Sequence, residues 1–126
     1  MRYIIAGGRD FNNYNILCAV MNTIKKYGPS VNEPITEIVT GDARGADTLG
    51  AQWAAAHDIP VIHFPADWET YGKSAGFIRN AKMGEYADIA ICFWDGKSKG
   101  TKNMIQTMKF NKKPYYVYDY GGNRII

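Results

Sequence analysis

Short apolar runs alternate with longer amphipathic segments along this chain, and glycine, proline or aspartate separates many of them. The apolar runs predict five strands, at residues 2–6, 35–40, 61–64, 88–93 and 115–118. The segments between them predict helices at 13–26, 46–57 and 76–85, and a fourth that starts at Gly100-Thr101. Because each helical segment is long enough for a crossover, we expect an α/β fold with a doubly wound, five-stranded parallel sheet. The Rossmann-like strand order 3-2-1-4-5 fits this alternation.

Two of the predicted helices carry more specific expectations. Asp10 or Asn12 should cap the first, which should end at Gly28 before a surface loop that extends to Pro34. The third should follow a long functional loop at 65–75 and direct four apolar side chains into the core, namely Phe77, Ile78, Ala81 and Met83. The tail at 121–126 carries no pattern.

Length and composition indicate one packed domain over residues 1–126, since 46% of the 126 residues are hydrophobic and 21% are charged. The first apolar run stops at Gly7, which leaves neither a secretory signal nor a membrane span, so we expect a cytoplasmic protein with no membrane partner. Cys18 and Cys92 lie in apolar stretches and should be buried, reduced thiols.

Unusual residues follow four of the predicted strands. Parallel strands end at one edge of the sheet, and in this fold the ligand crevice lies at that edge, between the first and fourth strands. A simple turn needs one glycine, asparagine or aspartate, whereas these loops repeat glycine together with arginine or lysine. The candidate ligand-binding residues are Gly7, Gly8, Arg9, Asp10, Gly41, Arg44, Gly45, Asp47, Asp67, Trp68, Tyr71, Lys73, Arg79, Asn80, Asp95, Ser98, Gly100 and Thr101.

These residue types suit a phosphorylated ligand. Glycines at strand-to-helix junctions leave helix N-terminal amides free for an anion, arginines supply counter-charge, and Trp68 or Tyr71 offers a stacking face. Each also has a structural interpretation: a tight turn for the glycines, a helix cap for Asp47 or Ser98, and a hydrophobic plug for the aromatic residues. For Arg79, near a helix start, the macrodipole favours the ligand interpretation.

Several chemistries are disfavoured by the sequence. It contains neither the GxGxxG dinucleotide fingerprint nor the GxxxxGK[ST] phosphate loop, and no cysteine or histidine cluster has metal-ligand spacing. We therefore expect no cofactor and no metal. His57 and His63 stand without a nucleophile or carboxylate at a recognisable spacing, so no catalytic triad is indicated.

Five runs resemble a known group: residues 5–11, 40–47, 65–76, Arg79-Asn80 with Met83, and 98–101. Together they are similar to the YspA-like family of the SLOG superfamily, which includes the DNA-processing protein of natural transformation and the lonely-guy phosphoribohydrolases. The resemblance implies a Rossmann-like domain that binds nucleotides or nucleotide-derived ligands. It implies a ligand class and no particular reaction.

Two positions depart from the pattern of these relatives. Asp42 replaces a common second glycine after Gly41, and its charge would repel a phosphate unless the side chain points away. Met104 stands where the lonely-guy pattern has a glutamate, so that carboxylate is missing.

The leading hypothesis is therefore binding of a nucleotide or a nucleotide-derived phosphorylated ligand. An alternative is a hydrolase of an N-glycosidic or phosphate bond in such a ligand, with Asp10, Asp47, Glu69 or Asp95 as the acid/base. Binding of single-stranded DNA is a further alternative, which the net charge of +3 supports only weakly. We also expect a homodimer, because the resemblance implies one and a small domain should expose several of Trp53, Trp68, Tyr86, Trp94 and Tyr120.

Overall fold

The computed structural model describes residues 1–28 and 32–126, and its centre is a parallel sheet of five strands. The strand order is β3-β2-β1-β4-β5, and every pairing is parallel, as the sequence predicts. The strands are β1 (Arg2–Gly7), β2 (Glu37–Thr40), β3 (Val61–His63), β4 (Ile89–Phe93) and β5 (Tyr115–Tyr118). This is the architecture expected of a Rossmann-like fold, in which the direction of strand order reverses between β1 and β4.

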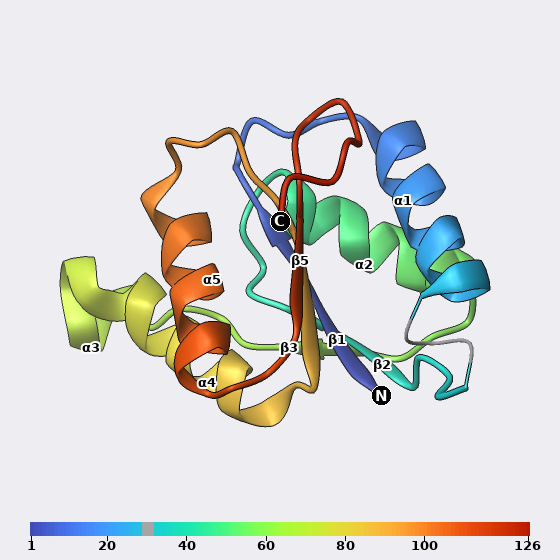
Figure 1. Ribbon diagram of the computed structural model, residues 1–126. Helices are drawn as coiled ribbons and strands as arrows, with labels where there is room; N and C mark the ends of the chain where they lie inside the picture. The colour runs from blue at the N-terminus through green and yellow to red at the C-terminus, as the bar shows by residue number, and fades with distance from the viewer. Residues whose placement is uncertain (29–31) are drawn as a thin grey trace.

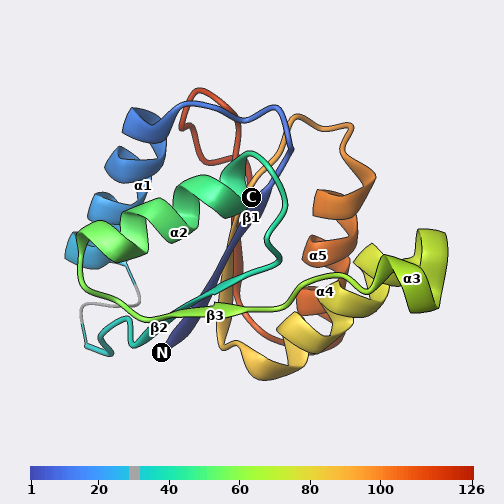
Figure 2. The ribbon, with the colours of Figure 1, turned by 180° about the vertical axis from the view of Figure 1, so that it is seen from behind.

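Helices cover both faces of the sheet (Figures 1 and 2). The helices α1 (Tyr14–Tyr27) and α2 (Ala46–Ala56) lie on one face. The other face carries α4 (Ala75–Tyr86) and α5 (Lys99–Phe110), while the short α3 (Trp68–Tyr71) extends outward beside α4. The sheet is therefore shielded from water on both sides, which explains why its inner strands are continuous apolar runs.

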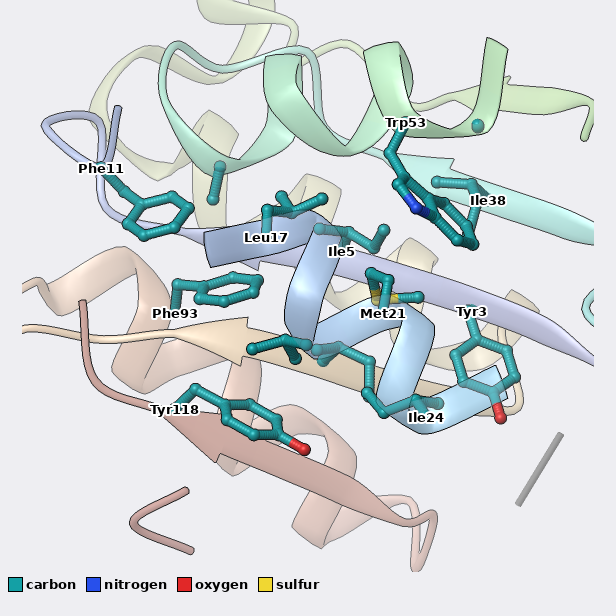
Figure 3. Close-up of a cluster of buried hydrophobic side chains, with 14 of the residues drawn as sticks. Tyr3, Ile5, Phe11, Leu17, Met21, Ile24, Ile38, Trp53, Phe93 and Tyr118 are labelled. Carbon is teal, nitrogen blue, oxygen red and sulfur yellow. The ribbon is translucent and has the colours of Figure 1, made fainter. Parts of the chain in front are cut away.

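The protein has two hydrophobic cores, one on each face of the sheet, and alternate side chains of β1 point into each of them. Tyr3 and Ile5 point to the α1/α2 side, and Ile4 and Ala6 point to the α4/α5 side. Figure 3 shows the first of these cores, in which the rings of Phe11 and Phe93 stack with centroids 4.6 Å apart. That stacked pair lies at the carboxyl end of the sheet and fixes the loop after β1 against β4.

Two details of the helices differ from the sequence prediction. Asn13 caps α1 in place of the predicted Asp10 or Asn12, because its Oδ1 accepts a hydrogen bond from the amide of Ile16, whereas Asp10 pairs with Tyr120. In α4, Phe77 and Ala81 are exposed and Ile78 is half-buried, while Met83 is buried as expected. The inward position is instead taken by Asn80, whose side chain has polar partners inside the protein.

Two segments without a clear sequence pattern are ordered by local hydrogen bonds. The predicted loop at 65–75 contains α3 and a 3-10 turn, Gly72–Ser74, and Asp67 caps α3 through the amide of Thr70. The tail folds back on β5, since the amides of Ile125 and Ile126 donate to the carbonyl of Val117. Of the predicted loop from Gly28 to Pro34, residues 29–31 lie outside the described part.

Other sequence expectations concern buried groups. Cys92 is buried and free, and burial raises the pKa of its thiol to about 12, whereas Cys18 is free but only half-buried. Trp53 is completely buried, in contrast to its expected exposure, because it packs beside Ile38 beneath α2. Tyr86, Trp94 and Tyr120 are half-buried.

Three segments meet at the turn after β1 (Figure 1). The amide of Gly8 donates to the carbonyl of Phe93, and the carbonyl of Gly8 accepts from the amides of Phe11 and Ala46. A Cβ on the preceding Gly7 would lie 2.5 Å from the carbonyl oxygen of Phe93 and 2.8 Å from Cβ of Ala46. The two glycines therefore permit the close approach of β1, β4 and α2 that forms this edge of the sheet.

We predict that Gly7→Ala lowers the free energy of unfolding by about 1–3 kcal/mol, because its methyl group meets backbone that cannot move alone. Urea unfolding at neutral pH measures this. Gly100→Ala is the matched control: a Cβ there has no neighbour within 4 Å, and alanine favours the helix. Equal stability of Gly7→Ala and the wild type would contradict the close-packing account.

Candidate functional site

Two adjacent clefts open at the carboxyl edge of the sheet. Cleft 1, of about 370 Å³, lies where the strand order reverses between β1 and β4. It is bordered by the turn after β1 and by the N-termini of α4 and α5. Cleft 2, of about 290 Å³, lies beyond the ends of β2 and β3. Both clefts are lined by the same four residues: Arg9, Ala43, Trp68 and Arg79.

Most residues predicted from the sequence come together in these clefts. Cleft 1 is lined by Gly7, Gly8, Arg9, Asp10, Asp47, Trp68, Lys73, Arg79, Asn80, Ser98, Gly100 and Thr101. Cleft 2 adds Gly41 and Arg44. Four predicted residues line neither cleft: Gly45, Asp67, Tyr71 and Asp95.

Those four residues have structural surroundings of their own. Gly45 precedes α2 with a φ of +81°, and a side chain there would collide with the carbonyl of Gly8. Asp67 caps α3, and Asp95 accepts hydrogen bonds from the amides of Lys97 and Ser98. These hydrogen bonds hold the pKa of both carboxyls below the usual range. Tyr71 is exposed on α3.

Arg79 is the central cation of the site. Its side chain crosses from α4 to the end of β2, where Nη1 donates to the carbonyl of Gly41 at 2.5 Å. The guanidinium lies directly against this glycine, since a Cβ at position 41 would be 2.7 Å from Cζ of Arg79. A glycine is thus required at position 41 because a side chain there would occupy the space of the Arg79 guanidinium. Backbone conformation does not require it, since the φ of Gly41 is not in the left-handed region.

Asn80 holds the other side of the same guanidinium. Its Oδ1 accepts from Nε of Arg79 at 3.0 Å, while its Nδ2 donates to the carbonyl of Gly100 and to Oδ1 of Asn103. Asn80 is buried, and its amide is occupied by these protein partners. It therefore fixes Arg79 relative to α5. Within the part of the chain that the structure describes, Nη2 of Arg79 has no hydrogen-bond partner.

Asp47 lies beneath the loop that Arg79 covers. It is 5% exposed, and its Oδ2 accepts from the amides of Gly41 at 3.1 Å and Ala43 at 3.4 Å. Burial raises the pKa of this carboxyl to about 6, although the charge of Arg79 and the two amides act in the opposite direction. Gly41 is therefore held from both sides, by Asp47 at its amide and by Arg79 at its carbonyl.

The N-terminus of α5 borders cleft 1 through Ser98, Gly100 and Thr101. Ser98 caps this helix by accepting from the amide of Thr101, which is the structural role considered for it above. The first-turn amides of Lys99 and Gly100 have no acceptor within the helix. Gly100 lines the cleft and has open space around its Cα. By contrast, the amide of Gly8 is used by the fold, as described above.

Two pairings at the rim join residues far apart in the sequence. Tyr120 donates to Oδ1 of Asp10 at 2.5 Å, and burial together with this bond raises the pKa of the phenol. Nδ1 of His63 lies 2.6 Å from Oδ1 of Asp42, whose backbone has a φ of +60°. The carboxylate of Asp42 thus has a partner of its own, although it still lines cleft 2.

The apolar part of cleft 1 was not predicted. Ala6, Met83 and Met104 line it, and the exposed ring of Phe77 lies at its rim with Trp68. The sequence predicted both Met83 and Phe77 to lie in the core, and this is wrong for Phe77 alone, because an apolar residue at helical spacing looks the same whether it lines a cleft or fills a core. Met104 places a thioether where the lonely-guy pattern has a carboxylate.

No group of three or more histidine, cysteine, aspartate or glutamate side chains in this part of the chain is arranged to hold a metal ion. No described helix combines the length and apolar character needed to cross a bilayer.

We predict that Asp47 makes stability depend on pH. Its pKa is higher in the folded protein than in the unfolded chain, so folding favours the protonated form, and this contribution is lost as pH rises from about 4 through about 6. Relative to Asp47→Asn, the wild type should lose about 3 kcal/mol of unfolding free energy between pH 4 and pH 7.5. Urea unfolding of both proteins at the two pH values measures this, and a pH-independent difference would contradict it.

The comparisons with known proteins bear on this edge of the sheet. A family model described as "YspA, cpYpsA-related SLOG family" matches residues 1–71, which include the turn after β1 and the loop from Gly41 to Asp47. The Gene 61 protein of Mycobacterium phage D29 is 38% identical over 76 residues, or 55% of this chain. The match spans 60% of that phage protein's length. No solved structure matches. Since the family model covers more than half of the 126 residues, the chain belongs to the YspA, cpYpsA-related SLOG family.

Proposed function

We propose that the protein binds a nucleotide or a nucleotide-derived phosphorylated ligand at the carboxyl edge of the sheet. Family membership suggests a nucleotide-related ligand in general. The observation that carries the proposal is Arg79, which is held by Gly41 and Asn80 at two of its nitrogens and keeps Nη2 for a ligand. A guanidinium fixed in this way is prepared for charge-assisted hydrogen bonds to a phosphate.

The remaining groups of cleft 1 fit the same ligand. Arg9 and Lys73 add positive charge, and the α5 N-terminus adds the amide of Gly100. The exposed rings of Trp68 and Phe77, which line the cleft together with the buried side chains of Met83 and Met104, suit the flat face of a nucleobase. Charge and apolar surface thus lie in one cleft, as a nucleotide requires.

A thermal-shift panel tests the proposal. It compares adenosine, guanosine, cytidine and uridine with their 5′-mono- and diphosphates and with a single-stranded DNA oligonucleotide, each added to the purified protein. At 100 times its dissociation constant, a ligand adds about 2.7 kcal/mol, which corresponds to a rise in Tm on the order of 10 °C for a domain of this size. We expect such a rise for at least one phosphorylated member and a much smaller rise for its nucleoside. A Tm raised only by single-stranded DNA would contradict the proposal.

Substitutions at the two arginines test which groups hold the phosphate. Arg9→Ala and Arg79→Ala should each weaken the bound nucleotide ten- to a hundredfold in calorimetric titration, because each removes charge-assisted hydrogen bonds. Gly41→Ala should also weaken it while keeping every charge, since the new methyl group displaces the guanidinium of Arg79.

Lys109→Ala is the control for these variants, because it removes one charge at the far end of α5. Arg9 is exposed, so its variant should unfold like the wild type. Arg79→Ala should also lose stability, because Asp47 would keep its buried carboxylate without the cation. Unchanged nucleotide affinity in Arg9→Ala, Arg79→Ala and Gly41→Ala would refute the assignment.

Hydrolysis of the bound ligand is a second candidate function, and Asp47 is the observation that favours it. A buried carboxyl in a cleft with a pKa near 6 suits general acid/base catalysis. Incubation of the nucleotide with the protein, followed by chromatography of the products, tests this. Turnover that Asp47→Asn abolishes while retaining affinity would support hydrolysis. A nucleotide that stays unaltered would contradict hydrolysis and leave binding as the only proposed function.

We also propose that the chain forms a homodimer. Although Trp53 proves buried, three exposed aromatic rings come from the neighbouring α3 and α4: Trp68, Tyr71 and Phe77. Such a group is a candidate contact for a second copy of the chain. Sedimentation velocity at micromolar concentration should show a species of twice 14.1 kDa, and a single 14.1 kDa species would refute this.

A further inference from the structure

The relation between the two clefts carries an inference that rests on the proposed function. Arg9, Ala43, Trp68 and Arg79 line both clefts, so these residues form a common wall with space on either side. Cleft 1 alone is near the lower end of the range for small-molecule sites, which is about 300–1,000 Å³, and cleft 2 falls just below it. A ligand that crossed the wall would use both spaces.

The common wall is the most favourable place for an anionic group of the ligand, because two arginine side chains lie there. Burial lowers the pKa of the Arg79 guanidinium, and the charge of Arg9, which lies close enough to repel it, lowers this pKa further. Asp47 and, more weakly, Asp42 offset part of this positive charge, and Asp42 also contacts His63. An anion that contacts both guanidinium groups would relieve their repulsion, and a diphosphate is long enough to span two such groups.

The two clefts differ in the chemistry that they offer. Among the residues that line cleft 1 alone, the exposed ring of Phe77 and the largely buried side chains of Met83 and Met104 are apolar. Apart from the four residues of the common wall, cleft 2 has the charged side chains of Asp42 and Arg44, the backbone of Gly41, and the small apolar surface of Pro65 and Ala66. A flat base fits the first set of groups, and a hydroxylated group that makes hydrogen bonds fits the second.

We propose that the two clefts form one bipartite site for a nucleoside diphosphate that is esterified at its distal phosphate. The nucleoside lies in cleft 1, the diphosphate crosses the wall at Arg9 and Arg79, and the polar group on the distal phosphate lies in cleft 2. A simple mono- or diphosphate leaves cleft 2 empty. The preferred ligand therefore has two ends, with the charge between them.

Paired calorimetric titrations test this proposal. ADP, GDP, CDP and UDP are each compared with the corresponding nucleoside diphosphate glucose, and the readout is the ratio of the two Kd values for one base. For the base that binds, we expect the glucose ester to bind at least tenfold more tightly than the diphosphate. Ala66→Trp, which fills cleft 2, and Arg44→Ala, which removes a polar group from it, should bring this ratio close to one. Lys109→Ala should leave the ratio as in the wild type.

The outcomes separate this proposal from the proposed function. Equal affinity for the diphosphate and its ester would overturn the bipartite site while leaving nucleotide binding intact. A ratio of ten that persists in both Ala66→Trp and Arg44→Ala would also overturn it, because the second group would then lie outside cleft 2. Absence of binding by all eight compounds at millimolar concentration would overturn the bipartite site, and the proposed function would fall with it only if no monophosphate raised the Tm either.

Discussion

The contact between Arg79 and Gly41 organises this edge of the molecule. One guanidinium reaches from α4 to the end of β2 and covers a glycine whose amide is held by the buried Asp47. This contact joins a helix on one face of the sheet to a helix on the other, because Asp47 belongs to α2. Burial makes both charged groups costly, so each depends on the other and on the backbone between them. The common wall of the two clefts exists because this pair is fixed.

The surrounding fold supplies the conditions for that contact. Gly7 and Gly8 let β1 approach β4 and α2 closely, and the stacked rings of Phe11 and Phe93 hold the turn after β1 in place. Asn80 then ties Arg79 to the start of α5. The cleft is therefore bordered by elements whose positions are set by packing and backbone hydrogen bonds. Such a site is preorganised, which lowers the entropic cost of ordering protein groups around a ligand.

The fold was predictable because its signals are local. β4 has five successive buried residues, and the loops rich in glycine and arginine that follow β1 and β2 mark the functional edge. The errors arise where tertiary contacts decide. Phe77 is exposed at the cleft and Asn80 is buried, because hydrogen bonds to Arg79 and Gly100 outweigh the apolar preference for the inward position. The pairings of Tyr120 with Asp10 and of His63 with Asp42 span 110 and 21 positions, and no local pattern marks them.

The central claim is that a fixed Arg79 guanidinium receives the anionic part of the ligand, and arginine side-chain NMR tests it most directly. The Nε–Hε resonance of Arg79, assigned by its loss in Arg79→Lys, should be shifted from the random-coil position and protected from exchange because Nε donates to Asn80. On titration with the nucleotide identified in the thermal-shift panel, the Arg79 side-chain resonances should shift to saturation together with those of Arg9. Arg79 resonances that stay at their free positions while the nucleotide saturates the protein would contradict the account.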